Sequence, residues 1–261
     1  TGLVIKLWKK YLQQLLDALG LTAEIYYRHF TGGANLAFTA DEDMLYTACE
    51  INEAAIELAR SEIAGDTPDQ QLTSVDNLHT LLKEERNPAL MALIHLAKEK
   101  QVPYLVDDDE FSLGMGPTSR RWTMEQLPDP DLLDWSVFTA IPVALLTGTN
   151  GKSTSVRMCG AIAKAASISA GVTSTDYIRA ADTILDKGDY SGPGGARTLI
   201  RDHRVQMALL EVARGGMLRR GLGTASAKAA LITNVADDHL GQYGINTVEE
   251  LIAVKAIVAR S

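Results

Sequence analysis

The sequence predicts an α/β protein in which a mostly parallel sheet carries a phosphate-binding loop, preceded by a smaller α/β domain. Two observations favour this fold class. From about residue 137 onward, short aliphatic runs alternate with helical stretches, which is typical of βαβ units. In addition, the apolar run Ile141–Thr147 passes through a glycine-containing turn directly into a helical stretch. A strand, a glycine-rich turn and a helix in this order are the elements of a P-loop.

The composition excludes several classes of partner. The chain has 261 residues and a net charge of −8, with 25 Lys and Arg against 33 Asp and Glu. An acidic chain lacks the electrostatic footprint of a nucleic-acid-binding protein. Cys49 and Cys159 form no CxxC pair and suit a reducing compartment, and no apolar run approaches the roughly 18 residues of a membrane span. We therefore expect a cytoplasmic protein that binds neither nucleic acid nor membranes.

Residues 1–106 alternate between helical and extended patterns. Leucines recur at helical spacing up to Leu19, and Gly20 follows as a helix stop. Gly32 and Gly33 separate two β-prone runs and predict a hairpin, while Pro88 interrupts a long helical stretch. The expected elements are a helix ending before residue 20, strands over 22–30 and 34–39, a helix from about 41 to 63, helices over 75–100 broken near 87–88, and a strand over 102–106.

A stretch rich in glycine and proline, 107–135, predicts irregular structure and a domain boundary. We therefore expect an N-terminal α/β domain of unclear role over 1–136 and an ATP-binding domain over 137–261. The acidic run Asp107–Glu110 is best read as a solvated turn, with cation binding as the alternative. Because the sequence starts at Thr1 without methionine and stops directly after a helical segment, we expect a fragment of a longer protein.

In the second half, strand-like and helical segments follow one another closely. This alternation is typical of parallel strands that helices cover on both faces. The segments are 143–147, 152–166, 171–174, 196–201, 206–212, 229–234 and 247–258.

The strongest single motif is the loop 148–154, which predicts contacts to ATP phosphates. Glycines allow backbone N–H groups to converge on phosphate oxygens, and the new helix directs its positive dipole end at the same anion. Lys152 reaches the terminal phosphates, and the Ser153 hydroxyl can ligate Mg²⁺. The general pattern requires a glycine separated by four residues from the Gly-Lys pair, at the position where this chain has Leu146. The residues expected to bind ATP here are Gly148, Thr149, Asn150, Gly151, Lys152, Ser153 and Thr154.

Four motifs in order resemble the Mur ligase superfamily. They are the loop 147–154, the run 211–222 (Glu-Val-Ala-Arg-Gly-Gly-Met-Leu-Arg-Arg-Gly-Leu), the run 233–241 (Thr-Asn-Val-Ala-Asp-Asp-His-Leu-Gly) and the helical segment 247–258. The second run is most similar to the cyanophycin synthetase branch of this superfamily. The resemblance covers about residues 137–261. It implies the central, ATP-binding domain of these ligases, with their C-terminal domain missing.

The resemblance also implies roles for individual residues. Ser153 and Glu211 would ligate the Mg²⁺ at the ATP phosphates, and His239 would help to hold a second Mg²⁺ near the acceptor carboxylate. Lys152, His239 and Lys255 would act in catalysis, Lys255 as the lysine that many Mur ligases carbamylate. Glu211 ends an apolar run, which places it at the carboxyl end of a strand, where ligands bind in open α/β sheets. Asn234 would contact ATP. Residues expected to bind the acceptor are Thr173, Ser174, Arg197 and Arg214, and the run Thr173-Ser174-Thr175-Asp176 after the second strand is expected to line that site.

Several of these residues also have a simpler interpretation, in which their role is structural and not functional. Glu211 can be a helix N-terminal acid, His239 a structural histidine and Lys255 a solvated helical lysine. Arginines such as Arg214 can be surface charges, although arginine beside a phosphate loop suits carboxylate or phosphate contacts.

Taken together, the motifs predict an ATP- and Mg²⁺-dependent ligase that joins a carboxylate acceptor, peptide-like or polyamide, to an amino acid through an acyl phosphate. We expect the isolated chain to have little or no ligase turnover. The alternatives are another P-loop ATPase or kinase, and a non-catalytic ATP-binding module. A GTPase is disfavoured because the guanine motif Asn-Lys-x-Asp is absent. The acceptor, the amino acid and the oligomeric state stay open.

Overall fold

The computed structural model describes residues 1–30, 32–69, 74–238 and 240–260, and the chain divides into two compact units, Thr1–Met91 and Ala92–Ser261. Helix α4 (Pro88–Glu99) carries the division between them. This division differs from the domain boundary at residues 136–137 that the sequence predicts. That boundary stays a prediction.

The first unit packs three helices and a two-stranded hairpin around an apolar core. Its largest buried side chains are Trp8, Leu12 and Ile51. Gly20 ends the first helix in the left-handed conformation (φ 68°), as expected of a glycine C-cap. The elements are α1 (Gly2–Leu19), β1 (Ile25–Phe30), β2 (Gly33–Phe38), α2 (Leu45–Ala64) and α3 (Val75–Glu85). The antiparallel pairing of β1 with β2 confirms the expected hairpin, and the end of α3 before Pro88, where α4 begins, confirms the expected helix break.

Charged side chains at the end of α3 fix the start of α2. The Glu85 carboxylate accepts hydrogen bonds from the backbone N–H groups of Tyr46 (2.8 Å) and Thr47 (2.7 Å), which are unsatisfied donors of the first helical turn. Arg86 binds the buried Asp43 carboxylate at 2.5 Å. These contacts are structural, and no predicted site residue lies in this unit.

The second unit begins with a small antiparallel sheet that the sequence did not predict. It contains β3 (Tyr104–Val106), β4 (Glu110–Leu113) and β5 (Arg120–Thr123). Only β3 was expected, because the glycines and prolines of 107–135 obscured the short strands on either side of a turn. The rings of Phe111 and Trp122 face each other across β4 and β5 with centroids 6.3 Å apart, and this pair stabilises the sheet. Short 3₁₀ turns follow at Gly116–Thr118, Met124–Gln126, Pro130–Leu132 and Trp135–Val137.

Asp107, at the turn between β3 and β4, is bound by two arginines and is not the freely solvated residue that the sequence suggested. Arg197 Nε donates to Asp107 Oδ1 at 2.7 Å, and Arg201 donates to Oδ2. Arg201 also donates to Ser112 Oγ at 2.8 Å. Desolvation favours the neutral form of Asp107, but both arginines outweigh it and hold the pKa of this carboxyl below its ordinary value. The acidic turn therefore joins the small sheet to α6 (Pro193–Ile200), the helix that carries Arg197.

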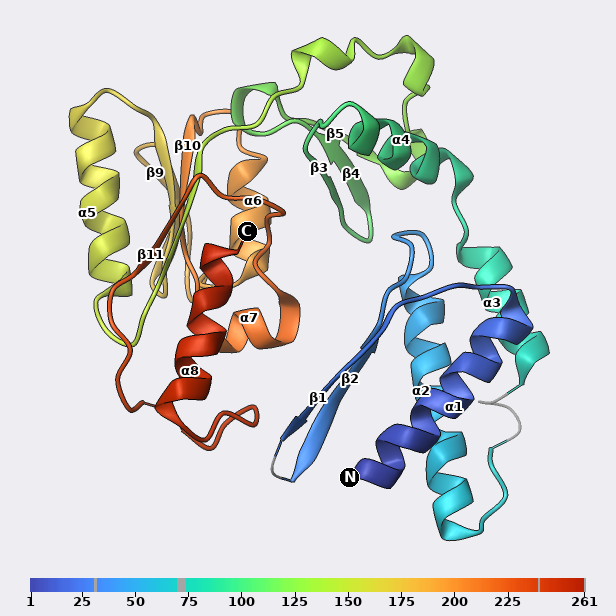
Figure 1. Cartoon of the computed structure of the whole chain (residues 1–261). Coiled ribbons are helices and arrows are strands. Elements are labelled where there is room, and N and C mark those ends of the chain that lie inside the picture. The colour runs from blue at the N-terminus through green and yellow to red at the C-terminus, as the bar shows by residue number, and fades with distance from the viewer. Residues whose placement is uncertain (31, 70–73, 239, 261) are drawn as a thin grey trace. The chain divides into compact units, whose positions relative to one another are not determined.

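A six-stranded, mostly parallel sheet forms the centre of the second unit, in the order β11-β6-β10-β7-β8-β9 (Figure 1). The first four strands of this order are parallel, and β8 and β9 add an antiparallel edge. The parallel sheet is thus confirmed, whereas the antiparallel hairpin was not foreseen. The strands are β6 (Val143–Thr147), β7 (Ala170–Thr173), β8 (Tyr177–Ala180), β9 (Thr183–Lys187), β10 (Met207–Glu211) and β11 (Ala229–Ile232).

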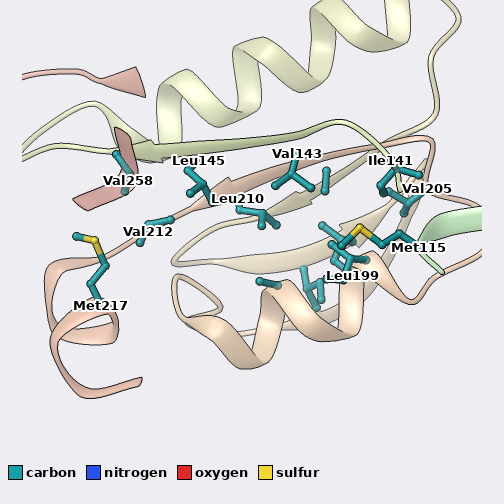
Figure 2. Packing of buried hydrophobic residues seen from close by; sticks show 14 of the residues in the cluster. Met115, Ile141, Val143, Leu145, Leu199, Val205, Leu210, Val212, Met217 and Val258 are labelled. Carbon is teal, nitrogen blue, oxygen red and sulfur yellow. The ribbon is translucent and has the colours of Figure 1, made fainter. Parts of the chain in front are cut away.

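Alternate residues of the central strands supply the cores on the two faces of this sheet. Val143, Leu145 and Leu210 pack with Leu199 of α6 on one face (Figure 2). Leu146 and the neighbouring strands pack on the other face against α5 (Lys152–Ala165). This period of two is what a strand covered on both sides requires. The first face is completed by α7 (Arg214–Arg220), α8 (Val248–Lys255) and a 3₁₀ turn, Ala256–Ala259.

Within the described residues, the helices are all too short or too polar to cross a bilayer, and Cys49 and Cys159 are free thiols.

Replacing Gly171 with alanine is expected to lower the free energy of unfolding by about 1–3 kcal/mol, because overpacking a filled core strains it. A Cβ at this position in β7 would lie 2.7 Å from the buried side chain of Leu199. Urea unfolding of the two proteins measures the difference.

The control for this substitution is Gly194→Ala in the first turn of α6, where a Cβ meets nothing within 4 Å. Alanine there favours the helix and is expected to leave stability unchanged or slightly raised. Equal stability of Gly171→Ala and the unmodified chain would contradict the proposed tight contact between β7 and α6.

Candidate active site

The loop that follows β6 has a shape that only glycine permits at its first position. Gly148 has φ of +150°, and a Cβ there would lie 1.9 Å from Thr233 Oγ1. Gly151 has φ of +82° and is the N-cap of α5. Leu146, where the general P-loop pattern has glycine, is a buried residue inside β6. The turn begins two residues later, at Gly148.

Residues after β11 hold this loop in place. Asn150 N–H donates to Asn234 Oδ1 at 3.1 Å, and Asn234 Nδ2 donates back to Asn150 O at 3.0 Å. Thr149 N–H donates to Asn234 O at 2.9 Å, and Thr233 Oγ1 donates to Asn150 O at 2.6 Å. Asn234, predicted to contact ATP, thus acts on the loop itself through both ends of its side-chain amide.

The first turn of α5 brings Lys152, Ser153 and Thr154 to the end of the loop. Lys152 Nζ donates to Thr149 O at 3.0 Å, so the ammonium folds back over the loop. The N-cap is glycine, which supplies no side-chain acceptor for the first N–H groups of the helix. A positive helix end with uncapped donors beside a lysine is an anion-binding arrangement.

The Glu211 carboxylate at the end of β10 lies beside the start of α5. Its Oε1 accepts a hydrogen bond from Ser153 Oγ at 3.1 Å, and its backbone N–H donates to Thr173 Oγ1 at 3.2 Å. The residue is only 2% exposed. Its Oε2 is buried and has no hydrogen-bond partner within the described part of the chain. A buried carboxylate oxygen without a partner is costly, and a bound cation would remove that cost.

These oxygens fit Mg²⁺ as the ion that the motifs imply. Mg²⁺ prefers oxygen ligands and retains several waters, so one carboxylate and one hydroxyl suffice on the protein side. Nowhere along the described ranges do three His, Cys, Asp or Glu side chains gather into a metal-binding group. A site that relies on Ser153 and Glu211 agrees with this finding. His239, predicted as a further ligand and catalytic residue, lies outside the described residues.

Lys255, at the end of α8, is buried near the same charges. It is 4% exposed, and the pKa of its amine is lowered to about 8, mainly because burial disfavours the charged form. The positive charges of Lys152 and Arg214 contribute to this lowering, while Asp238 opposes it. Lys152, Arg214 and Lys255 therefore lie close enough to interact, although they come from α5, α7 and α8. The alternative interpretation of Lys255 as a solvated lysine is wrong.

Of the predicted acceptor-binding residues, Arg214 is the one whose charge acts on Lys255. It begins α7, where Nη2 donates to Gln242 Oε1 at 2.9 Å and the guanidinium lies over the Tyr243 ring, 5.8 Å from its centroid. Arg197 is engaged elsewhere, with Asp107 and the carbonyl of Val106.

Thr173 and Ser174 are fully buried, and their hydroxyls bind within the protein. Thr173 Oγ1 accepts from Glu211, whereas Ser174 Oγ accepts from the N–H groups of Asp176 (3.2 Å) and Tyr177 (3.3 Å). Thr175, which follows them, is exposed, and its Oγ1 lies 3.3 Å from Ser153 Oγ. Sequence reasoning placed Thr175 in the run expected to line the acceptor site, but it did not predict this contact or the contact of Thr233 with the loop. The position of both residues just after strands β7 and β11 is the signal that could have found these contacts.

Residues 146–260 match the family described as the Mur ligase middle domain. Similar curated proteins are the cyanophycin synthetases of Geminocystis herdmanii, 44% identical over 121 residues, of Nostoc sp., 43% identical over 121 residues, and of Synechocystis sp., 42% identical over 119 residues. Each match covers 46% of this chain and 13–14% of the relative.

The chain thus spans only a small part of the relatives that it matches. The residues that match the family, 146–260, contain the loop, Glu211 and Lys255. The order of the motifs, the parallel sheet and these matches agree. Residues 146–260 therefore match the Mur ligase middle domain, and the chain is similar to cyanophycin synthetases over 119–121 residues.

Proposed function

We propose that this chain supplies the ATP-binding part of an ATP- and Mg²⁺-dependent ligase that joins a carboxylate to an amine. The observation that carries the proposal is the buried Glu211 carboxylate, hydrogen-bonded to Ser153 at the start of α5. A phosphate loop alone indicates a nucleotide and no particular reaction. The similarity of residues 146–260 to Mur ligases and cyanophycin synthetases supports the ligase class.

The loop and α5 would bind the triphosphate. Backbone N–H groups of the first helical turn, together with the Lys152 ammonium, would neutralise the β- and γ-phosphates. Ser153 and Glu211 would hold one Mg²⁺ at the ATP phosphates, and His239 would help to hold a second Mg²⁺ near the acceptor carboxylate. The ions would supply further charge neutralisation between nucleotide and acceptor. These groups are needed because the first step brings two anions, a carboxylate and a phosphate, into contact.

The reaction would proceed in two balanced steps. First, an oxygen of the acceptor carboxylate attacks the γ-phosphorus, a new P–O bond forms, and the bond to the ADP oxygen breaks. Next, the neutral amine of an amino acid attacks the carbonyl carbon of the acyl phosphate, a C–N bond forms, the C–O bond to the phosphate breaks, and inorganic phosphate leaves while the proton of the amine passes to solvent. Lys152 would stabilise the charge on the transferred group, and Arg214 would hold a carboxylate near it. The acceptor is proposed to be peptide-like or a polyamide.

Replacing Lys152 with alanine is expected to weaken ATP binding by about 10- to 100-fold, because a charged hydrogen bond contributes roughly 1.5–3 kcal/mol. Isothermal titration calorimetry with ATP and Mg²⁺ measures this. The matched control is Lys164→Ala in the last turn of the same helix, where the lysine pairs with Asp182 at 2.5 Å. Equal ATP affinity of Lys152→Ala and the unmodified chain would remove the support for a phosphate site.

Phosphate release from ATP by the protein that contains this chain is expected to require both an amino acid and Lys152. The measurement is a phosphate assay with a panel of amino acids, because the amine that stimulates release identifies the second substrate. Release that is indifferent to amino acids would favour a kinase or ATPase. ATP binding with no release would favour a binding module.

Carbamylation of Lys255 is expected to increase as the pH rises through about 8. The neutral amine attacks CO₂ and releases a proton, and the lowered pKa of Lys255, about 8 against an ordinary 10.5, makes the neutral amine abundant near neutral pH. ¹³C NMR with labelled bicarbonate across a pH series measures the carbamate. Lys255→Arg is the control, since arginine forms no such carbamate. A pH-independent signal, or the same signal in Lys255→Arg, would exclude this role.

A further inference from the structure

We infer that Thr175 is a positioning residue for Mg²⁺: its Oγ1 accepts the Ser153 proton when Ser153 turns a lone pair toward the metal. The inference rests on the proposed function, because it assumes that Ser153 and Glu211 bind the ion together. It concerns a residue that makes no required contact with the metal itself.

Three hydroxyl and carboxylate groups from different elements meet at one edge of the sheet. Ser153 begins α5, Thr175 lies between β7 and β8, and Glu211 ends β10. Ser153 Oγ lies between the other two, 3.1 Å from Glu211 Oε1 and 3.3 Å from Thr175 Oγ1. The Ser153 hydroxyl can therefore donate its proton in either of two directions.

The turn that carries Thr175 is held firmly on both sides. Ser174 N–H donates to Tyr177 O at 3.0 Å, and Tyr190 N–H donates to Ser174 O at 2.8 Å. On the other side of Thr175, the Asp176 carboxylate forms an ion pair with Arg157 of α5. The position of Thr175 beside the start of α5 is thus set by its neighbours, and its own hydroxyl is not needed to form the turn.

The number of protons on the three oxygens gives Thr175 its role. A serine hydroxyl has one proton and two acceptor lone pairs. Without metal, Ser153 donates that proton to Glu211 Oε1. When both oxygens ligate a cation, their lone pairs face the cation, and the proton no longer fits between them. Thr175 Oγ1 is the acceptor within reach, and because Thr175 is exposed, its own proton can turn to solvent.

Removing this acceptor would leave Ser153 as a poorer ligand. Groups that orient a metal ligand typically contribute about 10- to 100-fold to metal affinity. We expect Thr175→Val, which keeps the shape of the side chain but lacks the hydroxyl, to raise the Mg²⁺ dissociation constant about 10-fold. Thr175→Ser, which keeps the hydroxyl, should restore affinity to near that of the unmodified chain.

The test is titration of Mg²⁺ into the chain saturated with a non-hydrolysable ATP analogue, followed by calorimetry. Nucleotide affinity in the presence of a chelator and the melting temperature are measured for each variant, and both are expected to stay unchanged. Thr183→Val serves as the matched control, because Thr183 is an exposed threonine of β9 in the same sheet.

Two outcomes separate the inference from the proposed function. If the unmodified chain binds the nucleotide without any dependence on Mg²⁺, the proposed metal site is wrong and the inference fails with it. If Mg²⁺ binds and Thr175→Val binds it equally well, only the inference is overturned. Loss of metal-free nucleotide affinity in Thr175→Val would also overturn it, since Thr175 would then contact the nucleotide directly.

Discussion

The parallel pairing of β6 with β10 on one side and β11 on the other is the constraint on which the site depends. In this register Glu211 lies opposite Leu146, and Ile232 lies opposite Thr147. The chain segments that leave the three strands therefore emerge at one edge of the sheet. The phosphate loop, the Glu211 carboxylate and Asn234, which hydrogen-bonds to the loop, come together there, although they are far apart in the sequence. A shift of one residue in either pairing would turn these side chains to the opposite face.

The site is built from charges that are unfavourable for the fold alone. Glu211 and Lys255 are almost fully buried, and burying an ionised group costs free energy unless it is paired. Lys255 also lies near two other positive charges, which together with burial account for its lowered pKa. The apolar contacts between the sheet and its helices offset such costs (Figure 2). Residues that oppose local stability in this way are expected where binding determines the side-chain choice.

The sequence was most informative where backbone chemistry is local. The order of strand, Gly148–Gly151 and helix predicted the loop, and the alternation of aliphatic segments predicted the parallel sheet. It did not reveal partners that are distant in the sequence. Arg197, expected at the acceptor, binds Asp107, and no pattern along the chain relates these two residues. The hairpin β8–β9 and the helix α7 were also missed, because segments of four to seven residues carry too little periodicity to distinguish from loops.

The brace formed by Thr233 and Asn234 means that the phosphate loop is not a self-contained module. Its backbone is closed by the two-way hydrogen bonding between Asn150 and Asn234, and the space at Gly148 is filled by Thr233. Transplanting the seven-residue loop into another α/β scaffold would carry over the glycines and the lysine without the strand that shapes them. To transfer the loop, a protein designer would have to transfer two separate segments, 148–154 and the residues Thr233 and Asn234, together. A substitution in one segment therefore changes which substitutions the other can accept.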